Sequence, residues 1–348
     1  MIGLAIGLEL CQQGARVSLL SRNFGEAASH AAAGMLAPQA EQIPPGAMLD
    51  LCLQSRDLYA EWSRKLEALT GMETGYWACG ILAPTYSDEA AAYPPALLES
   101  SHWLDRSAIQ QQQPGLSPEV VGGWWYPQDA QVDNRKLTRA LWTAAQEAGI
   151  RVQEGVTVQE ILYQGDRVSG VATSAGEFRA DHYILATGAW SQALLPIPVV
   201  PRKGQMLSVR VPQGQELPLR QVLFGDIYIV PRQDGQIVIG ATSETVGFTS
   251  GNTPVGVKSL LDRALRLVPG FQELEIEEIW WGFRPATPDE LPLLGSSPYK
   301  NLTLATGHYR NGILLTPITA QLIARWVLHQ QPEPLLEAFH WSRFQAQQ

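Results

Sequence analysis

The sequence predicts two interleaved domains, one a doubly wound α/β domain and the other an α+β domain built on an antiparallel sheet. Residues 1–14 have the pattern of a helix that ends at a glycine, and a short apolar strand follows at 16–20; together they make half of a βαβ unit. Residues 204–242 contain segments of alternating apolar and polar side chains, which is typical of antiparallel strands. The 348 residues, 45% of them hydrophobic, are enough for more than one core.

The composition excludes several classes of protein. The formal net charge is −9 and only 17% of the residues are charged, so no basic surface for nucleic acid is expected. No apolar stretch approaches the roughly 18 residues that span a bilayer. Glu9 and Gln12 interrupt the apolar start before it could serve as a secretory signal. We therefore predict neither a nucleic-acid partner nor membrane association.

The cysteine content indicates the compartment. Cys11, Cys52 and Cys79 are odd in number and lack the spacing of metal ligands. This pattern favours a reducing environment over a disulfide framework, and it predicts a cytoplasmic protein without a metal site.

The remaining elements follow from hydrophobic periodicity and from turn and capping residues. An amphipathic helix is predicted over 48–69, and another begins after the capping residue Asp133 and ends at Gly149. The Pro-, Ser- and Gln-rich segment that follows the first of these, up to about residue 128, predicts surface loops with short elements. A last helix is predicted over 312–328. The strands are predicted at 150–162, 167–173, 178–186, 204–210, 222–230 and 236–242, with a turn at Asp234-Gly235.

The opening helix carries only part of the fingerprint that binds a dinucleotide. The complete fingerprint needs a preceding strand and three glycines, so that backbone N–H groups can approach a pyrophosphate. Only the third glycine is present, as Gly3, and alone this pattern fits an ordinary surface helix equally well. Where an acid commonly binds the ribose, the sequence has Ser21 and Arg22. We expect a true start about a dozen residues before Met1, which an in-frame strand and Gly-x-Gly there would support and an upstream stop codon would contradict.

Further segments point to a ligand. Residues 30–38 are a run of small side chains, where nothing bulky blocks the approach of a flat ligand, although a small-residue helical turn is the alternative. A period of two puts Asp226 and Tyr228 on one face of a strand. Arg284 and Arg310 have apolar and aromatic sequence neighbours, where a guanidinium needs an anionic partner. A structural salt bridge and an anionic ligand are both open for each arginine.

Short segments along the chain match one known superfamily in order and spacing, over essentially the whole chain apart from its beginning. They are 31–36 (AAAGML), 186–191 (ATGAWS), 228–231 (YIVP), 281–285 (WGFRP) and 307–315 (GHYRNGILL). Each is moderately specific alone. Together they resemble the D-amino-acid oxidase superfamily, and most closely the bacterial glycine oxidases of thiamin synthesis.

The resemblance implies FAD held without a covalent bond, in a Rossmann-like FAD-binding domain that here lacks its first strand. That domain would comprise 1–75, 129–197 and 285–348, and the substrate domain 76–128 and 198–284. The flavin would lie under the loop of residues 33–35 and against 307–315. The residues implied for FAD are Met1, Ile2, Gly3, Ser21, Arg22, Ala28, Ser29, Ala33, Gly34, Met35, Val158, Thr187, Gly188, Trp190, His308, Tyr309, Arg310, Asn311, Gly312, Ile313 and Leu314.

The resemblance also implies a substrate site. Arg310 would bind the substrate carboxylate, Arg284 would be a second arginine near it, and Tyr228 would supply a hydroxyl; these are the implied catalytic residues. Met35 and Asp226 would complete the substrate contacts. Asp226 stands where a histidine is expected in the closest relatives, which leaves the preference among glycine, sarcosine and small D-amino acids open.

The implied reaction is the oxidative deamination of glycine, or of small amines and D-amino acids, to the imine and glyoxylate. A guanidinium fork can fix the substrate carboxylate, so that hydride transfer from the neutral amine needs no strong protein base. The amino-terminal dipole of the last helix would stabilise negative charge on the reduced flavin. Molecular oxygen would be reduced to H2O2, and the product would pass to thiazole synthase. The relatives include homotetramers, which implies a homo-oligomer.

Alternatives from the same and from another class stay open. A sarcosine oxidase with flavin on a carboxyl-terminal cysteine is disfavoured because no cysteine follows Cys79. A D-amino-acid oxidase is close in chemistry, and a dehydrogenase would need a membrane or quinone contact, for which no basic amphipathic stretch is present. A truncated remnant without FAD or activity is the other class. The missing strand favours it, whereas the retained Tyr228, Arg284 and Arg310 count against it.

Overall fold

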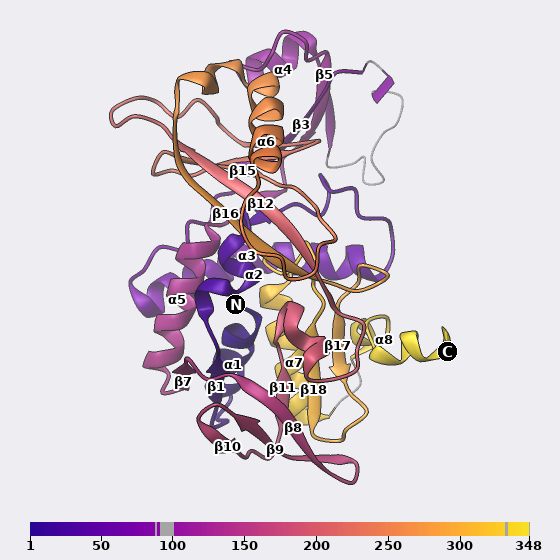
Figure 1. The fold of residues 1–348 in the computed structure, drawn as a ribbon. Helices are drawn as coiled ribbons and strands as arrows, with labels where there is room; N and C mark the ends of the chain where they lie inside the picture. The colour runs from indigo at the N-terminus through magenta and orange to yellow at the C-terminus, as the bar shows by residue number, and fades with distance from the viewer. Residues whose placement is uncertain (88, 91–100, 331–332, 348) are drawn as a thin grey trace.

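The computed structural model describes residues 1–87, 89–90, 101–330 and 333–347. In Figure 1 the upper half contains a large sheet with α4 (Arg106–Gln112) and α6 (Pro254–Leu267), and the lower half contains α1 (Ile2–Gln12) and α7 (Thr316–His329). The amino terminus lies where the two halves meet (Figure 1). None of the helices in the described residues is long and apolar enough to cross a membrane.

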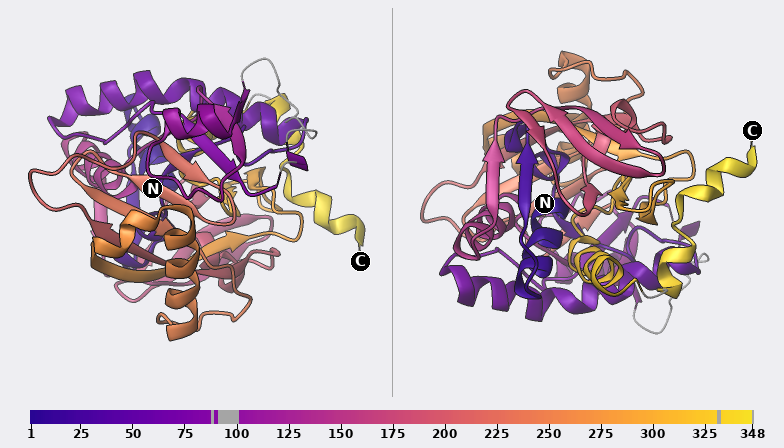
Figure 2. Two further views of the ribbon diagram at one scale, coloured as in Figure 1. Left: turned by 90° about the horizontal axis from the view of Figure 1, so that it is seen from above. Right: turned by 90° about the horizontal axis from the view of Figure 1, so that it is seen from below.

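The lower half begins with the predicted helix and strand. A Cβ atom added to Gly7 of α1 would lie 3.4 Å from Val17, and one added to Gly3 would lie 3.9 Å from Leu19, so the small side of the helix packs closely on the strand that follows and on the residue before it. That strand, β1 (Ser18–Ser21), pairs in parallel with β7 (Arg151–Glu154), and Figure 2 shows the two side by side. A second sheet contains β11 (Tyr183–Leu185), β18 (Leu302–Thr306) and β17 (Leu293–Ser296). In the described residues these two sheets share no strand.

Helices enclose the core of this half. The helix α3 (Ala47–Thr70) runs along one side of the molecule (Figure 2), and with α5 (Asn134–Glu147) and α7 it contributes most of the buried apolar side chains around α1. Smaller elements complete the half: the antiparallel strands β8 (Val158–Gln164), β9 (Arg167–Thr173) and β10 (Gly176–Phe178), the pair β2 (Met35–Leu36) and β6 (Ala130–Gln131), and the short helices α2 (Ala28–Ala31) and α8 (Pro334–Glu337).

The upper half is an eight-stranded sheet, antiparallel except where β13 and β3 pair in parallel. One face is covered by α4 and α6, and the other face contacts residues 31–40 of the lower half. The strand order is β16 (Glu275–Ala286), β12 (Val200–Arg210), β15 (Gln236–Gly240), β14 (Tyr228–Pro231), β13 (Val222–Phe224), β3 (Ile81–Thr85), β5 (Gly122–Tyr126) and β4 (His102–Asp105).

Several expectations about individual elements were wrong. The segment up to residue 128 was expected to be surface loops with short elements, yet its strands β3 and β5 lie inside the large sheet and not at the surface, with Ile81 and Tyr126 fully buried. The strand expected at 150–162 is interrupted between β7 and β8, where Gly155 has a φ of +79°. The strand expected at 178–186 is divided between β10 and β11, which belong to different sheets.

Two boundaries near the predicted site also differ from expectation. The last helix begins at Thr316 rather than at residue 312, because residues 310–315 form turns. Asp226 lies in the turn before β14, so it does not share a strand face with Tyr228.

The amino-terminal cap of α5 gives a first testable expectation. The Asp133 carboxylate accepts hydrogen bonds from the N–H groups of Arg135 and Lys136, both at 2.9 Å. We expect Asp133→Ala to lower the free energy of unfolding by about 1 kcal/mol, because these N–H groups have no other partner in the helix. Asp133→Asn keeps an acceptor and should lose less. Urea unfolding followed by circular dichroism tests this, and equal midpoints for the two variants would contradict it.

Candidate active site

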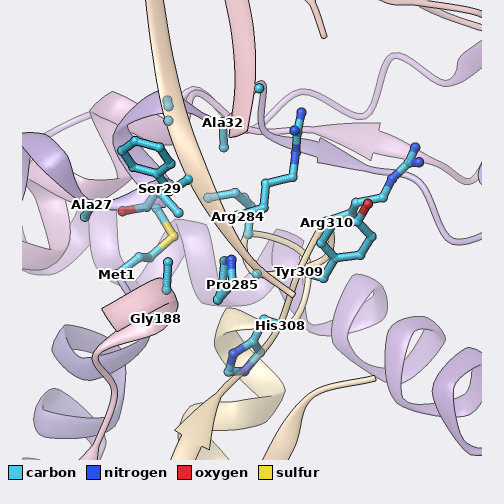
Figure 3. A pocket seen from close by; sticks show the side chains of 18 of the residues that line it. Met1, Ala27, Ser29, Ala32, Gly188, Arg284, Pro285, His308, Tyr309 and Arg310 are labelled. Carbon is cyan, nitrogen blue, oxygen red and sulfur yellow. The ribbon is translucent and has the colours of Figure 1, made fainter. Parts of the chain in front are cut away.

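A large cavity of about 590 Å³ lies between the two halves of the molecule. Its volume is within the range of about 300–1,000 Å³ that is usual for sites of small molecules and cofactors. Figure 3 shows that it is elongated: Met1, Ser29 and Gly188 lie towards one end, and Arg310 lies at the other, with Arg284 between them.

The first end of the cavity combines a helix terminus with the end of a parallel strand. Met1 and Ile2 line it, so the unpaired N–H groups of the first turn of α1 lie beside the cavity. Ser21 and Arg22, at the carboxyl end of β1, also line it, and the Arg22 guanidinium lies 4.8 Å from the centre of the Trp190 ring. A helix amino terminus beside the carboxyl ends of parallel strands is suited to a phosphate group.

A buried hydroxyl indicates that a polar ligand belongs in this part of the cavity. Ser29 Oγ is buried, lines the cavity and has no hydrogen-bond partner among the described residues. The Ser29 backbone is fixed because Asn134 Nδ2 donates to its carbonyl oxygen at 2.7 Å. An unpartnered buried hydroxyl is costly, so a polar group of a ligand is the natural partner. Together with the helix terminus, this hydroxyl means that the residues present fit the polar parts of FAD.

The loop of residues 33–35 forms the middle of the cavity wall. Gly34 has a φ of +76°, and an added Cβ atom would lie 1.9 Å from the Val132 carbonyl oxygen. The Val132 N–H donates to the Gly34 carbonyl oxygen at 2.8 Å, and Arg232 Nη2 donates to the Ala33 carbonyl oxygen at 2.8 Å. The loop is therefore fixed from behind, and only glycine fits at its centre.

The second end of the cavity carries an arginine and a tyrosine from two strands of the large sheet, β16 and β14. Arg284 on β16 donates from Nη1 to the Thr242 carbonyl oxygen at 3.2 Å, and the Tyr228 hydroxyl donates to Met206 Sδ at 3.1 Å. A Cβ atom on Gly204 would lie 2.3 Å from Arg284 Nη1, so this glycine makes room for the guanidinium. Burial raises the pKa of Tyr228, so its hydroxyl keeps its proton and can donate a hydrogen bond.

A carboxylate that the sequence did not indicate also lines this end. Glu41 Oε2 lies 3.6 Å from Arg310 Nε. Burial raises the pKa of Glu41, while the positive charges of Arg310 and Arg284 oppose that rise. Sequence pattern could not have found this contact, because Glu41 follows the small-residue run in a loop without periodicity. Its only signal is an acid within a mainly apolar segment.

The segment 308–315 closes the cavity on the side of α7. Burial lowers the pKa of His308 to about 3, so this ring is neutral, and its Nε2 lies 3.2 Å from Thr319 Oγ1. Tyr309 has a φ of +46°, and its N–H donates to the Pro285 carbonyl oxygen at 2.9 Å. From α3, Ser55 Oγ donates to the Leu314 carbonyl oxygen at 2.6 Å. These bonds hold the turns that present Arg310.

The structure brings most of the predicted site residues to this one cavity. Gly3, Asn311 and Leu314 do not line it, and Leu314 is buried in the core. The described residues contain no cluster of three or more His, Cys, Asp or Glu side chains arranged to hold a metal. The predicted residues that line the cavity are Met1, Ile2, Ser21, Arg22, Ala28, Ser29, Ala33, Gly34, Met35, Val158, Thr187, Gly188, Trp190, Asp226, Tyr228, Arg284, His308, Tyr309, Arg310, Gly312 and Ile313.

Several lining residues were not predicted. They come from the large sheet and from turns whose approach to the cavity depends on tertiary packing, and they include Ala27, Glu41, Gly204, Met206, Phe224, Thr242 and Phe283.

Known proteins resemble this chain in sequence and in fold. The chain is 58% identical to the bifunctional protein ThiO/ThiG of a Nostoc species over 100% of this chain; it spans about half (54%) of that longer relative. It is 35% identical to a glycine oxidase of Geobacillus kaustophilus, over 99% of this chain and 94% of the relative. The crystal structure of a glycine oxidase from Bacillus cereus superposes with a TM-score of 0.90 at 30% identity, covering 97% of this chain and 94% of that one.

A family model described as DAO, FAD dependent oxidoreductase, matches residues 1–326. This match and the superposition confirm the predicted fold class and the predicted cofactor, FAD. The chain therefore belongs to the DAO family of FAD-dependent oxidoreductases.

Proposed function

We propose that the protein oxidises glycine to the imine, which hydrolyses to glyoxylate, with reduction of oxygen to H2O2. The observation that carries this proposal is the Arg284 guanidinium beside the Tyr228 hydroxyl, at the end of a cavity that fits FAD. A guanidinium and a neutral hydroxyl are the groups that bind a small carboxylate. The relative named glycine oxidase, which this chain matches over 94% of the relative's length, supports glycine as the substrate.

In this proposal the first end of the cavity binds the polar parts of FAD. The amino-terminal N–H groups of α1 bind phosphate, and Ser29 Oγ takes up its missing hydrogen bond. Ser21 and Arg22 lie where the ribose would be bound, and the 33–35 loop supports the ring system. Bound FAD supplies the acceptor for the two electrons of amine oxidation and delivers them to oxygen.

The protein's own part in the reaction is binding and orientation. Arg284 holds the substrate carboxylate, and the Tyr228 hydroxyl donates a second hydrogen bond to it. Because both side chains come from strands of one sheet, β16 and β14, the substrate is held in a single orientation. The resemblance to the D-amino-acid oxidase superfamily implied that Arg310 binds the substrate carboxylate. The ion pair between Arg310 and Glu41 instead favours Arg284 for that contact.

The deciding experiment is a visible spectrum of the purified protein, followed by anaerobic addition of glycine. We expect flavin absorbance that glycine bleaches and that air restores, with H2O2 formed in proportion to the glycine consumed. Sarcosine and D-alanine should be compared at the same concentrations. A protein that binds FAD but is bleached only by sarcosine or by a D-amino acid would overturn glycine as the substrate. A colourless protein that does not take up added FAD would favour the inactive remnant.

The partners and the location belong to the same proposal. We propose that the product passes to thiazole synthase, and the existence of a bifunctional relative about twice as long supports a link to a second activity. A homo-oligomer and a cytoplasmic location stay predictions. Size-exclusion chromatography with light scattering tests the first, and fractionation of cells tests the second.

A further inference from the structure

Three charged side chains meet at the substrate end of the cavity. Arg284 and Arg310 bring two positive charges, and Glu41 brings one negative charge. The Glu41 carboxylate is close enough to both guanidinium groups to interact with each of them, and its nearest contact is the 3.6 Å ion pair with Arg310. Among these three side chains, one positive charge is therefore left without a negative partner.

The position of Glu41 is fixed by the fold. Its N–H donates to the Ala37 carbonyl oxygen at 3.0 Å, and the preceding residue, Ala40, donates its N–H to Asp129 Oδ2 at 2.8 Å. Asp129 is fully buried and is held in turn by Arg56 Nη1 at 3.2 Å. The Glu41 side chain is only 12% exposed. The backbone at Glu41 is therefore fixed, and the ion pair with Arg310 holds its carboxylate at this end of the cavity.

We propose that Glu41 is a specificity-determining residue, which pairs with Arg310 and thereby restricts the site to substrates with a single carboxylate. This inference rests on the proposed function, because it takes Arg284 as the ligand of the substrate carboxylate. A second carboxylate on the substrate would have to compete with Glu41 for Arg310. It would also be repelled by the Glu41 carboxylate, which opposes binding.

The test compares the binding of a monoanion, acetate, with that of a dianion, malonate. Neither contains an amine, so neither can be oxidised by the protein. Binding of acetate and malonate to the FAD-loaded protein is measured by calorimetry for wild type and Glu41→Gln. We expect Glu41→Gln to increase the affinity for malonate relative to acetate by at least about tenfold, because Arg310 becomes free. The kcat/KM for D-aspartate relative to glycine should rise in the same direction.

A matched control is available outside the cavity. Glu333 Oε1 lies 2.9 Å from Arg325 Nε, and its side chain is 18% exposed, close to the 12% of Glu41. Glu333→Gln therefore makes the same chemical change in a similar ion pair, and it should leave the malonate-to-acetate ratio unchanged. An unchanged ratio in Glu41→Gln, or an equal rise in Glu333→Gln, would overturn the proposal. Loss of glycine turnover in Glu41→Gln with a shifted pH profile and an unchanged ratio would assign Glu41 to proton transfer instead.

A second measurement covers the case in which Glu41→Gln does not fold. Arg310→Met should weaken acetate binding much less than Arg284→Met does, because Arg310 is already paired. Equal losses would contradict the proposal. Glycine turnover by the wild type decides the proposed function separately, since the binding ratios require no reaction.

Discussion

Replacing Arg284 by methionine is expected to lower kcat/KM for glycine by at least about 100-fold, with FAD still bound. The change removes both the charge that attracts the carboxylate and the fork that fixes its direction. Arg284→Lys keeps the charge without the fork, so it should recover only part of the loss. Steady-state oxygen uptake, with the flavin absorbance of each variant as the measure of loading, gives the comparison.

The control for this prediction is an arginine on β12, the strand that pairs with β16, which carries Arg284. Arg210 on β12 forms an ion pair with Glu277 on β16 at 2.5 Å and does not line the cavity. Arg210→Met removes an arginine from the same sheet and should leave kcat/KM within about threefold of wild type. If Arg284→Met lost no more activity than Arg210→Met, Arg284 could not be the carboxylate ligand.

Gly34→Ala is expected to destabilise the protein by more than about 3 kcal/mol and to release FAD. The added methyl group would meet the Val132 carbonyl oxygen at 1.9 Å. That oxygen cannot move away freely, because Arg232 Nη1 donates to it at 3.0 Å. Urea unfolding measures the loss of stability, and the visible absorbance of the purified variant measures the bound flavin.

Gly14 separates the effect of backbone conformation from that of the clash. Gly14 also has a positive φ, +91°, but an added Cβ atom would have no heavy atom within 4 Å. Gly14→Ala should therefore cost only about 1–2 kcal/mol, from the left-handed conformation alone, and the protein should remain yellow. Equal losses in the two variants would mean that the contact with Val132 is relieved by a small shift.

The parts of the fold that local signals determine were predicted from the sequence. The opening helix, the strand after it, the cap at Asp133 and the turn at Asp234-Gly235 each depend on residues only a few positions apart. The strands β3 and β5 were not predicted, since Ile81 pairs with both Tyr126 and Val222, which are remote in the chain. The segments that flank β3 and β5 are rich in Pro and Gln and have the composition of loops. Only pairing with strands from elsewhere in the chain makes β3 and β5 strands.

The candidate site divides in the same way. Arg284 and Arg310 stood out because a charged side chain in an apolar segment is costly without a partner, and Tyr228 stood out through the segment that matches the superfamily. Glu41 did not, because its partner comes from a turn near the other end of the chain. Residues that acquire a role only through such contacts have no pattern in the sequence to reveal them.

The buried Arg232 determines how this protein can move. It follows β14, the strand that carries Tyr228, and it binds four acceptors of the lower half: Gln131, Val132, Ala33 and Asn134. The Arg232 side chain thus connects the end of β14 to the loop of residues 33–35 through hydrogen bonds. The two halves cannot open like a hinge at this point without exposing a cation that loses all four acceptors at once. We therefore expect substrate to enter the cavity without separation of the two halves at Arg232.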